Sequence, residues 1–393
     1  MGKTVYLDYS AGMPTDKRVV EVMLPYFSHE FGNPSSLHAY GGPARTAVET
    51  AREQVAKLVG APDLKYIIFT SGATESNNLA IKGLARKRAD KGKHIITSMA
   101  EHMSILNVCK ALEKEGFKVT YLPIDKEAFV SVKAVEEAIK DDTILVTLGY
   151  ANGEVGTIQD IKAIGEICQK KKVAFHVDAV PAAGRIPIDV KAEHIDLMTI
   201  SSNDLYGPKG VGALYVGKGM DIVPLFDGGG QERKFRSGTE NVPGIVGMGK
   251  AAELAMAEMG AEAKRLMALR DRLIDMVLKA IPASHLNGSR TKRLPQNANM
   301  RFSYIEGEAL ILNLDMVDVC TSTSSACTSK TLEPSHVLRA MGISHEEAHS
   351  ALLINLGRLT RDEDIDVMIK VLPEIVKRLR EMSPLTPKGL YKD

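Results

Sequence analysis

Several polar residues of this sequence lie where an apolar, strand-like run ends, which is where α/β proteins place their ligands. In TSGATESNN, Thr70 ends such a run and a helix is expected to begin at about Ala73. Free N–H groups at a helix N-terminus, with the hydroxyl groups of Ser71 and Thr74 beside them, can bind an anion such as a phosphate. An ordinary capped turn between a strand and a helix would give the same pattern, so both interpretations stay open.

Three other motifs carry candidate side chains. Asp178 ends the run HVDAV at the expected ligand-binding edge of a sheet, although a lone acid there is often only a helix cap. His102 follows another strand-like run in AEHMSIL, where a histidine is more often a satisfied polar residue than a catalyst. RSGTENV, residues 236–242, sets a glycine between hydroxyl groups after an arginine. No one of these motifs identifies a function.

An acid stands in a loop that otherwise suits an anionic ligand. TISSNDLYGPKGVGALYVG, residues 199–217, begins as a strand end rich in hydroxyl groups and continues into a Gly-Pro-Lys-Gly turn. Asp204 lies between these two features. What its carboxylate does there decides whether the chain is an enzyme.

Composition and charge favour small-molecule chemistry. The 393 residues are 44% apolar and 25% charged, enough for one large core or two smaller ones. A net charge of +1 gives no long-range field for nucleic acid or an anionic membrane, so neither is expected as a partner. The sequence shows no leader-like segment and no run of eighteen apolar residues, and we expect a cytoplasmic protein.

The four cysteines have no C-x-x-C spacing, which argues against both a disulfide framework and a zinc knuckle. Cys109 and Cys168 lie on apolar helix faces and Cys320 lies at a strand end, so structural roles are expected for these three. Cys327 stands in the polar run TSTSSACTSKT, which suits an exposed thiolate, although an inert loop thiol is the alternative.

Alternation of strand-like and helical patterns predicts an α/β fold with a mainly parallel sheet covered by helices on both faces. After about residue 245 a long helix to about residue 280 leads into strands and helices that predict a smaller α+β domain. We place the large domain at residues 15–259 and the small one at residues 1–14 and 260–393. The seven strands expected in the large domain are YIIFTSG, HIITSM, KVTYLPI, TILVTLGY, VAFHVDAV, DLMTISS and GALYVG.

Ordered motifs along nearly the whole chain resemble the cysteine desulfurases of the NifS/IscS type. That family has the class V aminotransferase fold, which is the type I fold of the transferases that depend on pyridoxal phosphate. The motifs are YLDYSAGMPTDKRV, FGNPSS, FTSGATESNNLAIKG, EHMSIL, DDTILV, HVDAV, YGPKGVGALYV, RSGTENVPGIVGMG, SSACTSKTLEPSHVLRAMG and LREMSPL.

The resemblance implies a role for each candidate around the cofactor phosphate. Ala73 and Thr74 would bind the phosphate, assisted by Ser201 and by Thr239, the latter from the other subunit of a homodimer. Asn203 would lie in the same cofactor pocket.

The resemblance also implies roles at the cofactor ring and at the sulfur. His102 would stack on the ring, and Asp178 would hold the ring nitrogen protonated through a charge-assisted hydrogen bond. Cys327 would take sulfur from cysteine as a persulfide and pass it to a scaffold protein of iron–sulfur cluster assembly.

The sequence departs from the family pattern at the residue that bonds the cofactor. The family has His-Lys before Tyr-Gly-Pro-Lys-Gly and uses that lysine to bond the cofactor aldehyde, whereas this chain has Asn203 and Asp204. A carboxylate cannot form that bond. Lys209 is not a substitute, because the family keeps both lysines and uses the earlier one.

Further departures surround the same pocket. The second asparagine of the family's Asn-Asn-Glu is Gly153, and the glutamine that faces the cofactor's phenolic oxygen is Pro181. The arginine that anchors the substrate carboxylate aligns with Leu353, which cannot offer a bidentate fork.

Two hypotheses follow. In the first, the chain works in iron–sulfur cluster assembly with a scaffold protein of the IscU type and offers Cys327 as a sulfur carrier or as a ligand to a shared iron–sulfur cluster. Pyridoxal phosphate is then bound without a covalent bond, or absent. In the second, the chain is an active desulfurase that uses non-covalent pyridoxal phosphate to convert L-cysteine to L-alanine, with the persulfide on Cys327.

Overall fold

The computed structural model describes residues 4–323 and 333–391. A seven-stranded sheet forms the centre of its larger part, in the order β2-β8-β7-β6-β5-β3-β4. Strand β8 runs antiparallel to both of its neighbours, and the other neighbouring strands run parallel to one another. All seven predicted strands are confirmed: β2 (Ile67–Thr70), β3 (His94–Ser98), β4 (Lys118–Leu122), β5 (Thr143–Gly149), β6 (Ala174–Asp178), β7 (Leu197–Ser201) and β8 (Gly212–Val216).

Helices cover both faces of this sheet, so that neighbouring residues of one strand belong to different cores. Ile67 and Phe69 pack into one core, whereas Ile68 between them packs into another, as the alternation of side chains along a strand requires. The first core includes residues of α3 and α7, and the second includes residues of α4 and α5. The helices of this part are α1 (Lys17–Met23), α2 (Pro25–Ser28), α3 (Gly41–Leu58), α4 (Ala73–Lys87), α5 (Met103–Lys114), α6 (Val132–Ala138) and α7 (Ile161–Lys171).

The smaller part has two sheets. Strand β10 (Asn297–Phe302) lies between β9 (Ser284–Leu286) and β12 (Ala351–Asn355) in an antiparallel sheet, and β1 (Val5–Tyr6) pairs in parallel with β11 (Val319–Cys320). Helices α9 (Gly307–Asp315) and α12 (Asp362–Met382) pack into the core of this part. The buried residues of α10 (His336–Ala340) and α11 (His345–His349) pack into the core of the larger part.

A core of its own fills the smaller part, and that core includes Val5 and Leu7 from the N-terminus together with residues from 266 to 376. Residues after 259 also enter the core of the larger part, among them Leu294, Leu338 and Ala351, and the domain boundaries at residues 14/15 and 259/260 stay a prediction.

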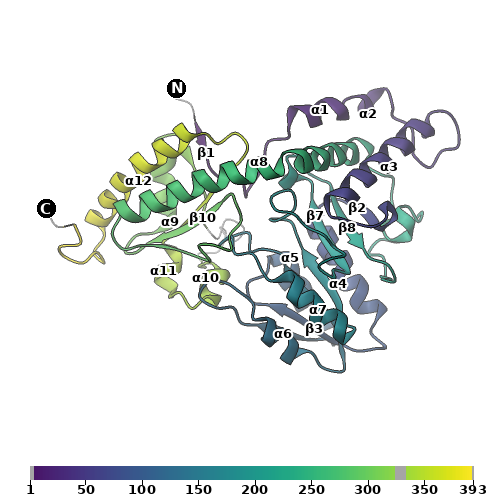
Figure 1. Cartoon of the computed structure of the whole chain (residues 1–393), viewed down its shortest axis with the longest axis horizontal. Coiled ribbons are helices and arrows are strands. Elements are labelled where there is room, and N and C mark those ends of the chain that lie inside the picture. The colour runs from purple at the N-terminus through teal and green to yellow at the C-terminus, as the bar shows by residue number, and fades with distance from the viewer. Residues whose placement is uncertain (1–3, 324–332, 392–393) are drawn as a thin grey trace.

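Helix α8 (Val242–Ala280) joins the two parts, and its 39 residues confirm the long helix expected after residue 245. Its first turns pack into the core of the larger part through Ile245 and Met248, and its last turns pack into the smaller core through Leu273 and Val277. Figure 1 shows α8 running across the molecule from one part to the other. None of the helices in the described chain is long and apolar enough to cross a lipid bilayer.

Candidate cofactor site

A chain of hydrogen bonds joins two of the predicted site residues, Asp178 and His102. Asp178 ends β6, and its Oδ2 accepts a hydrogen bond of 2.8 Å from Nδ2 of Asn77 in α4. The same nitrogen lies 2.8 Å from Oγ of Ser104 in α5, and that oxygen lies 2.8 Å from Nδ1 of His102. The backbone N–H of Ser104 donates to Nδ1 of His102 at 3.1 Å, so Nδ1 is an acceptor and the Ser104 hydroxyl donates to it. The chain fixes the carboxylate and the imidazole relative to each other.

Asp178 is buried, and burial raises the pKa of its carboxyl. Hydrogen bonds from Asn77 and from the backbone N–H of Val180 lower that pKa. A cation placed against the carboxylate would lower it further, because an opposite charge favours the ionised form. The protonated ring nitrogen of pyridoxal phosphate is such a cation, so Asp178 fits this cofactor.

The N-terminus of α4 lies near this chain, since Asn77 belongs to the same helix as Ala73 and Thr74. Gly72 precedes the helix, and no side chain caps the helix among the residues that the structure describes. The acid of the first turn, Glu75, accepts a hydrogen bond from Ser71 N at 2.8 Å and pairs with Nε of Arg236 at 3.0 Å. Its charge is thereby partly offset, so the helix end can still attract a phosphate.

Thr239 belongs to the segment that follows Arg236, and its side chain is exposed. The ion pair between Arg236 and Glu75 ties that segment to the first turn of α4. The residues before Arg236 are attached to α3 by a buried ion pair. In that pair the carboxylate of Glu232 accepts hydrogen bonds from both terminal nitrogens of Arg52 at 2.7 and 2.9 Å. These contacts set the segment of Thr239 beside the proposed phosphate site, while its role across a subunit interface stays a prediction.

Ser201, Asn203 and Asp204 lie together after β7, where the chain forms a short 3-10 helix, Asn203–Leu205. Burial raises the pKa of Asp204, hydrogen bonding to Ser201 and the charge of Arg185 lower it, and the charge of Asp178 raises it again. Asp178 ends β6, and β7, which leads to Asp204, is the neighbouring parallel strand, so the two acids lie at the same edge of the sheet.

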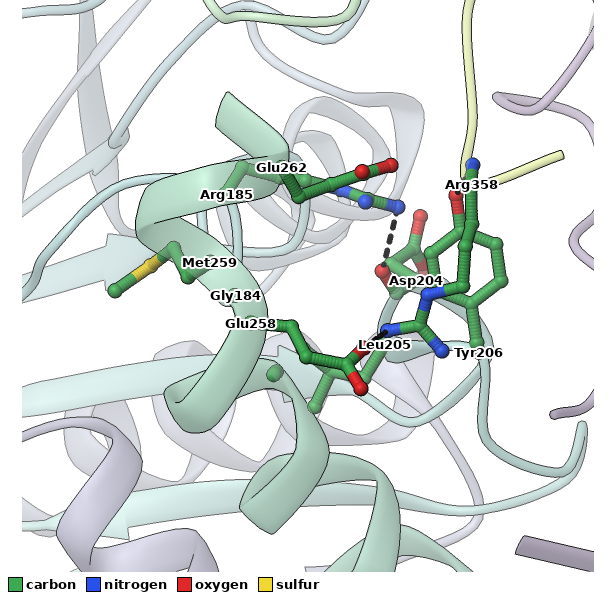
Figure 2. Close-up of a pocket in the computed structure, with 10 residues that line it drawn as sticks. Gly184, Arg185, Asp204, Leu205, Tyr206, Glu258, Met259, Glu262 and Arg358 are labelled. Carbon is green, nitrogen blue, oxygen red and sulfur yellow. Dashed lines mark hydrogen bonds and ion pairs between the residues drawn. The ribbon is translucent and has the colours of Figure 1, made fainter. Parts of the chain in front are cut away.

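A small cavity of about 10 Å³, enough for the centre of one water molecule, lies behind Asp204. Figure 2 shows Glu258 and Glu262 of α8 on one side of this cavity and Asp204 and Tyr206 on the other. The guanidinium group of Arg185 is buried and donates a hydrogen bond of 3.2 Å to the backbone oxygen of Asp204.

The ring of Tyr206 helps to hold this loop. The guanidinium carbons of Arg185 and Arg358 lie 4.8 and 4.5 Å from the ring centroid, within the range of cation–π contact. Arg358 also pairs with Asp16 and with Glu258. The position of Asp204 is therefore fixed by contacts from α8, the N-terminal segment and the smaller part of the chain.

Lys209, the lysine of the YGPKG motif, is engaged elsewhere. Nζ of Lys209 donates a hydrogen bond of 3.0 Å to the backbone oxygen of Met13. The backbone N–H of Met13 in turn donates to Oδ1 of Asn203 at 3.5 Å. This arrangement supports the expectation that Lys209 does not replace a cofactor-bonding lysine at position 204.

Two of the departures from the family pattern face each other. A Cβ built on Gly153 would lie 3.7 Å from Cβ of Pro181, so a longer side chain at position 153 would meet the proline. The backbone oxygen of Pro181 accepts a hydrogen bond of 3.3 Å from Gln296. The third departure, Leu353, is buried in β12 and pairs with Ser322 through two backbone hydrogen bonds.

The cysteines that the structure describes match the expectation of structural roles. Cys109 and Cys168 are buried in α5 and α7, and burial raises the pKa of each thiol to about 12. Cys320, at the end of β11, is partly exposed. Cys327, expected as a sulfur carrier or cluster ligand, lies outside the described residues. Among the described residues, no group of three or more His, Cys, Asp or Glu side chains could hold a metal ion.

Four residues of the site were missed by sequence reasoning: Asn77, Ser104, Glu101 and Arg185. The position of Asn77 could have been recognised from the sequence, because it lies four residues before Ile81 on the apolar face of α4. A buried amide on such a face needs a hydrogen-bond partner. Glu101 is a buried acid that accepts hydrogen bonds from Ser98 Oγ at 2.6 Å and Gly149 N at 2.7 Å. Burial raises the pKa of Glu101 to about 7.

The chain is similar to known proteins over nearly its whole length. Residues 5–368 match the family described as aminotransferase class V. The chain is 56% identical over 382 residues to cysteine desulfurase IscS 1 of Archaeoglobus fulgidus, an alignment that covers 97% of this chain and 99% of that protein. It is 54% identical over 386 residues to cysteine desulfurase IscS of Methanosarcina thermophila, with 98% and 95% of the two chains covered.

A solved structure of a NifS-like protein superimposes with a TM-score of 0.90 at 37% identity, covering 96% of this chain and all of that one. This likeness confirms the predicted type I fold. The chain therefore belongs to the class V aminotransferase family and, within it, to the cysteine desulfurases of the IscS and NifS type.

Proposed function

We propose that this protein works in iron–sulfur cluster assembly as a member of the cysteine desulfurase family whose desulfurase chemistry is impaired. The observation that carries the proposal is Asp204, an acid at the same sheet edge as Asp178 and at the position where the family resemblance places the cofactor-bonding lysine. A carboxylate cannot bond an aldehyde, and Lys209 is occupied by the backbone oxygen of Met13.

Pyridoxal phosphate, the cofactor of the family, is held here without a covalent bond or is absent. When bound, it supplies an electron sink for chemistry at an amino acid. Asp178 would hold its ring nitrogen, His102 would stack on its ring, and Ala73, Thr74, Ser201 and Thr239 would bind its phosphate. Asn203 would line the same pocket, and the hydrogen bonds of Asn77 and Ser104 would orient Asp178 and His102.

Cys327 is proposed to take part in sulfur or cluster transfer to a scaffold protein of the IscU type. It would either carry sulfur as a persulfide or serve as a ligand to an iron–sulfur cluster shared with that partner. A cytoplasmic homodimer is the proposed assembly, in which Thr239 would reach the cofactor site of the other subunit.

A second function, active desulfuration, is favoured by one observation. The hydrogen-bonded chain from Asp178 to His102 is complete, and the N-terminus of α4 lies beside it. In this alternative, non-covalent pyridoxal phosphate supports conversion of L-cysteine to L-alanine, with the sulfur atom transferred to the thiol of Cys327 as a persulfide.

An absorption spectrum of the purified protein, recorded before and after borohydride, tests the state of the cofactor. We expect no reducible bond to the protein and loss of any cofactor on dialysis. Cofactor that stays on the chain through denaturing gel filtration would show that a lysine of this chain bonds it. Release of sulfide from L-cysteine at an ordinary enzymatic rate would favour the second function over the first.

Replacement of Cys327 by serine tests its role directly. The polar sequence around Cys327 predicts an exposed loop, where such changes shift stability by about 0.5 kcal/mol or less, so Cys327→Ser should leave the protein folded. It should nevertheless abolish sulfur or cluster transfer to the scaffold. Cys320→Ser is the matched control and should retain transfer. If Cys327→Ser supports cluster assembly at the parental rate, the thiol has no such role.

A further inference from the structure

Two acids lie at the carboxyl ends of neighbouring parallel strands of the large sheet. Asp178 is the last residue of β6 and stands opposite Thr199 of β7. Asp204 follows β7 in the short 3-10 helix Asn203–Leu205, and its carboxyl group is hydrogen-bonded to Ser201, the last residue of that strand. The bond to Ser201 keeps the carboxyl group of Asp204 at the sheet edge where Asp178 lies.

The cationic side chains around Asp204 are engaged with other groups. Nη2 of Arg185 donates a hydrogen bond of 3.2 Å to the backbone oxygen of Asp204 and lies 3.0 Å from Sδ of Met13 (Figure 2). Nζ of Lys209 donates to the backbone oxygen of Met13. In the part of the chain that the structure describes, neither Asp178 nor Asp204 forms a salt bridge with a lysine or an arginine. The site therefore presents two acids whose charge a ligand can balance.

Removal from water raises the pKa of both carboxyl groups, because it disfavours their charged form. A cation bound against each acid would offset that cost, and an ammonium group or a protonated ring nitrogen can also donate a hydrogen bond to the carboxylate. A ligand that suits this pair of acids therefore carries two cationic groups. A ligand with a single cationic group leaves one of the carboxylates unpaired.

The cofactor of this family has an aldehyde form and an amine form that differ in this respect. Pyridoxal phosphate carries one cationic group when its ring nitrogen is protonated, because its aldehyde is neutral. Pyridoxamine phosphate carries two, since its aminomethyl group, on the side of the ring opposite the ring nitrogen, is a primary amine that is protonated at neutral pH. Both forms have the same phosphate, so the N-terminus of α4 does not distinguish them.

We propose that this site selects the amine form, pyridoxamine phosphate, with Asp204 paired to its aminomethyl group and Asp178 to its ring nitrogen. This inference rests on the proposed cofactor site and names the form of the cofactor that the site takes. The aldehyde form finds no lysine to bond at position 204, whereas the amine form finds a carboxylate of opposite charge there. A protein that holds the amine form has no aldehyde to offer to the amino group of cysteine, which agrees with impaired desulfurase chemistry.

The test measures, by titration calorimetry, the binding of three compounds to the full-length protein after dialysis. The compounds are pyridoxamine phosphate, pyridoxal phosphate and deoxypyridoxine phosphate, which has a methyl group where the first has its aminomethyl group. A hydrogen bond between charged groups in such a site is strong enough to change affinity about tenfold or more. We therefore expect the dissociation constant of pyridoxamine phosphate to be lower than those of the other two by about tenfold or more.

Three variants assign the preference to its residues. Asp204→Asn keeps the shape of the side chain and removes its charge, so the three dissociation constants should then agree within about threefold. Asp178→Asn should weaken the binding of all three compounds and leave their order unchanged, because each has the ring nitrogen. Asp141→Asn changes an exposed acid and is the control, which should match the parent.

The outcomes separate this inference from the proposed function. If the parent binds pyridoxal phosphate as tightly as pyridoxamine phosphate, or more tightly, selection of the amine form is wrong and the proposed cofactor site stands. If Asp204→Asn keeps the parental preference, Asp204 is not the partner of the aminomethyl group and the inference is wrong. If the parent binds none of the three compounds, the proposed cofactor site is wrong together with the inference.

Discussion

Asn77 and Asp178 are joined by a hydrogen bond of 2.8 Å between the amide nitrogen of one and Oδ2 of the other. Both side chains are buried, and the same amide nitrogen also lies 2.8 Å from Ser104 Oγ. One amide therefore orients the proposed partner of the cofactor's ring nitrogen and the residue that binds His102. A buried carboxylate is expensive to ionise, and this bond helps to keep Asp178 charged for a cationic ring.

Loss of this amide should weaken cofactor binding. Asn77→Ala removes a hydrogen bond to a charged group, worth about 1.5–3 kcal/mol, so we expect the dissociation constant for pyridoxal phosphate to rise at least tenfold. Titration of the free cofactor, followed by absorption, measures the change. Asn78→Ala is the control, because the amide of Asn78 donates instead to the backbone oxygen of Thr74. Equal affinities for the parent and Asn77→Ala would show that the amide does not support Asp178.

The strands of the large sheet could be predicted because most are buried on both faces. IIFT in β2 and HIITS in β3 read as nearly continuous apolar runs, which is typical of such strands. The direction of β8 was not predicted. Only ten residues separate Ser201 at the end of β7 from Gly212 at the start of β8, and a parallel crossover needs about a dozen or more.

The candidate site could be predicted only where a residue carries its own local signal. Asp178 and His102 follow strand ends, so the sequence places them at the ligand-binding edge. The hydrogen bonds through Asn77 and Ser104 depend on how α4 packs against α5, which no local pattern specifies. Arg185 reaches Asp204 across the fold for the same reason. The contact between Gly153 and Pro181 likewise required coordinates, because the two residues lie on different loops.

The buried acid Glu101 should give the protein a distinctive dependence of stability on pH. Burial raises its pKa from the usual 4.5 to about 7, so the folded state keeps a proton that the unfolded state has lost between these two values. The contribution of Glu101 to the free energy of unfolding is therefore fully present below pH 4.5. It falls as the pH rises towards 7 and stays constant above that pH. The loss amounts to about 3 kcal/mol.

Glu101→Gln should remove this loss, because glutamine resembles the protonated acid and stays neutral. We expect the variant to gain stability relative to the parent between pH 4.5 and pH 8, by up to about 3 kcal/mol. Thermal unfolding at a series of pH values measures the difference, and Asp178 and Asp204 titrate in both proteins. Glu136→Gln, an exposed change, should follow the parent. Parallel curves for the parent and Glu101→Gln would mean that the pKa of Glu101 is the same in the folded and unfolded states.

The pair of Arg52 and Glu232 should stabilise the segment that leads to Thr239. The side chain of Glu232 is 3% exposed, and it also accepts a hydrogen bond of 2.8 Å from Phe69 N in β2. Glu232→Ala leaves a buried guanidinium without this partner and should cost about 3–5 kcal/mol in denaturant unfolding. Arg52 also pairs with Glu49, whose side chain is 45% exposed, so Glu49→Ala should cost less than about 1 kcal/mol. Equal losses of unfolding free energy in Glu232→Ala and Glu49→Ala would show that the buried ion pair stabilises the protein no more than the exposed one.

Restoring a lysine at position 204 tests whether Asp204 is the only cause of impaired chemistry. Asp204→Lys should give a yellow protein whose cofactor becomes fixed to the chain by borohydride, because the α4 N-terminus and Asp178 would place the aldehyde near the new amine. The bond should persist when Lys209→Gln is added, since Lys209 is bound to the backbone oxygen of Met13. A cofactor that stays free in Asp204→Lys would show that position 204 does not face the aldehyde.

Turnover by Asp204→Lys should nevertheless remain poor. Without an arginine at position 353 the carboxylate of a bound cysteine has no bidentate partner, and misplacement of the reacting atoms can lower the rate by a factor of ~100. The contact between Gly153 and Pro181 leaves no polar side chain from either residue to control the phenolic oxygen of the cofactor. Sulfide release from L-cysteine with a reductant should therefore rise in the order parent, Asp204→Lys, and Asp204→Lys with Leu353→Arg. Full activity in the single variant would show that the changes at positions 153, 181 and 353 do not impair the reaction, and Asp204 alone would then account for the difference from an active desulfurase.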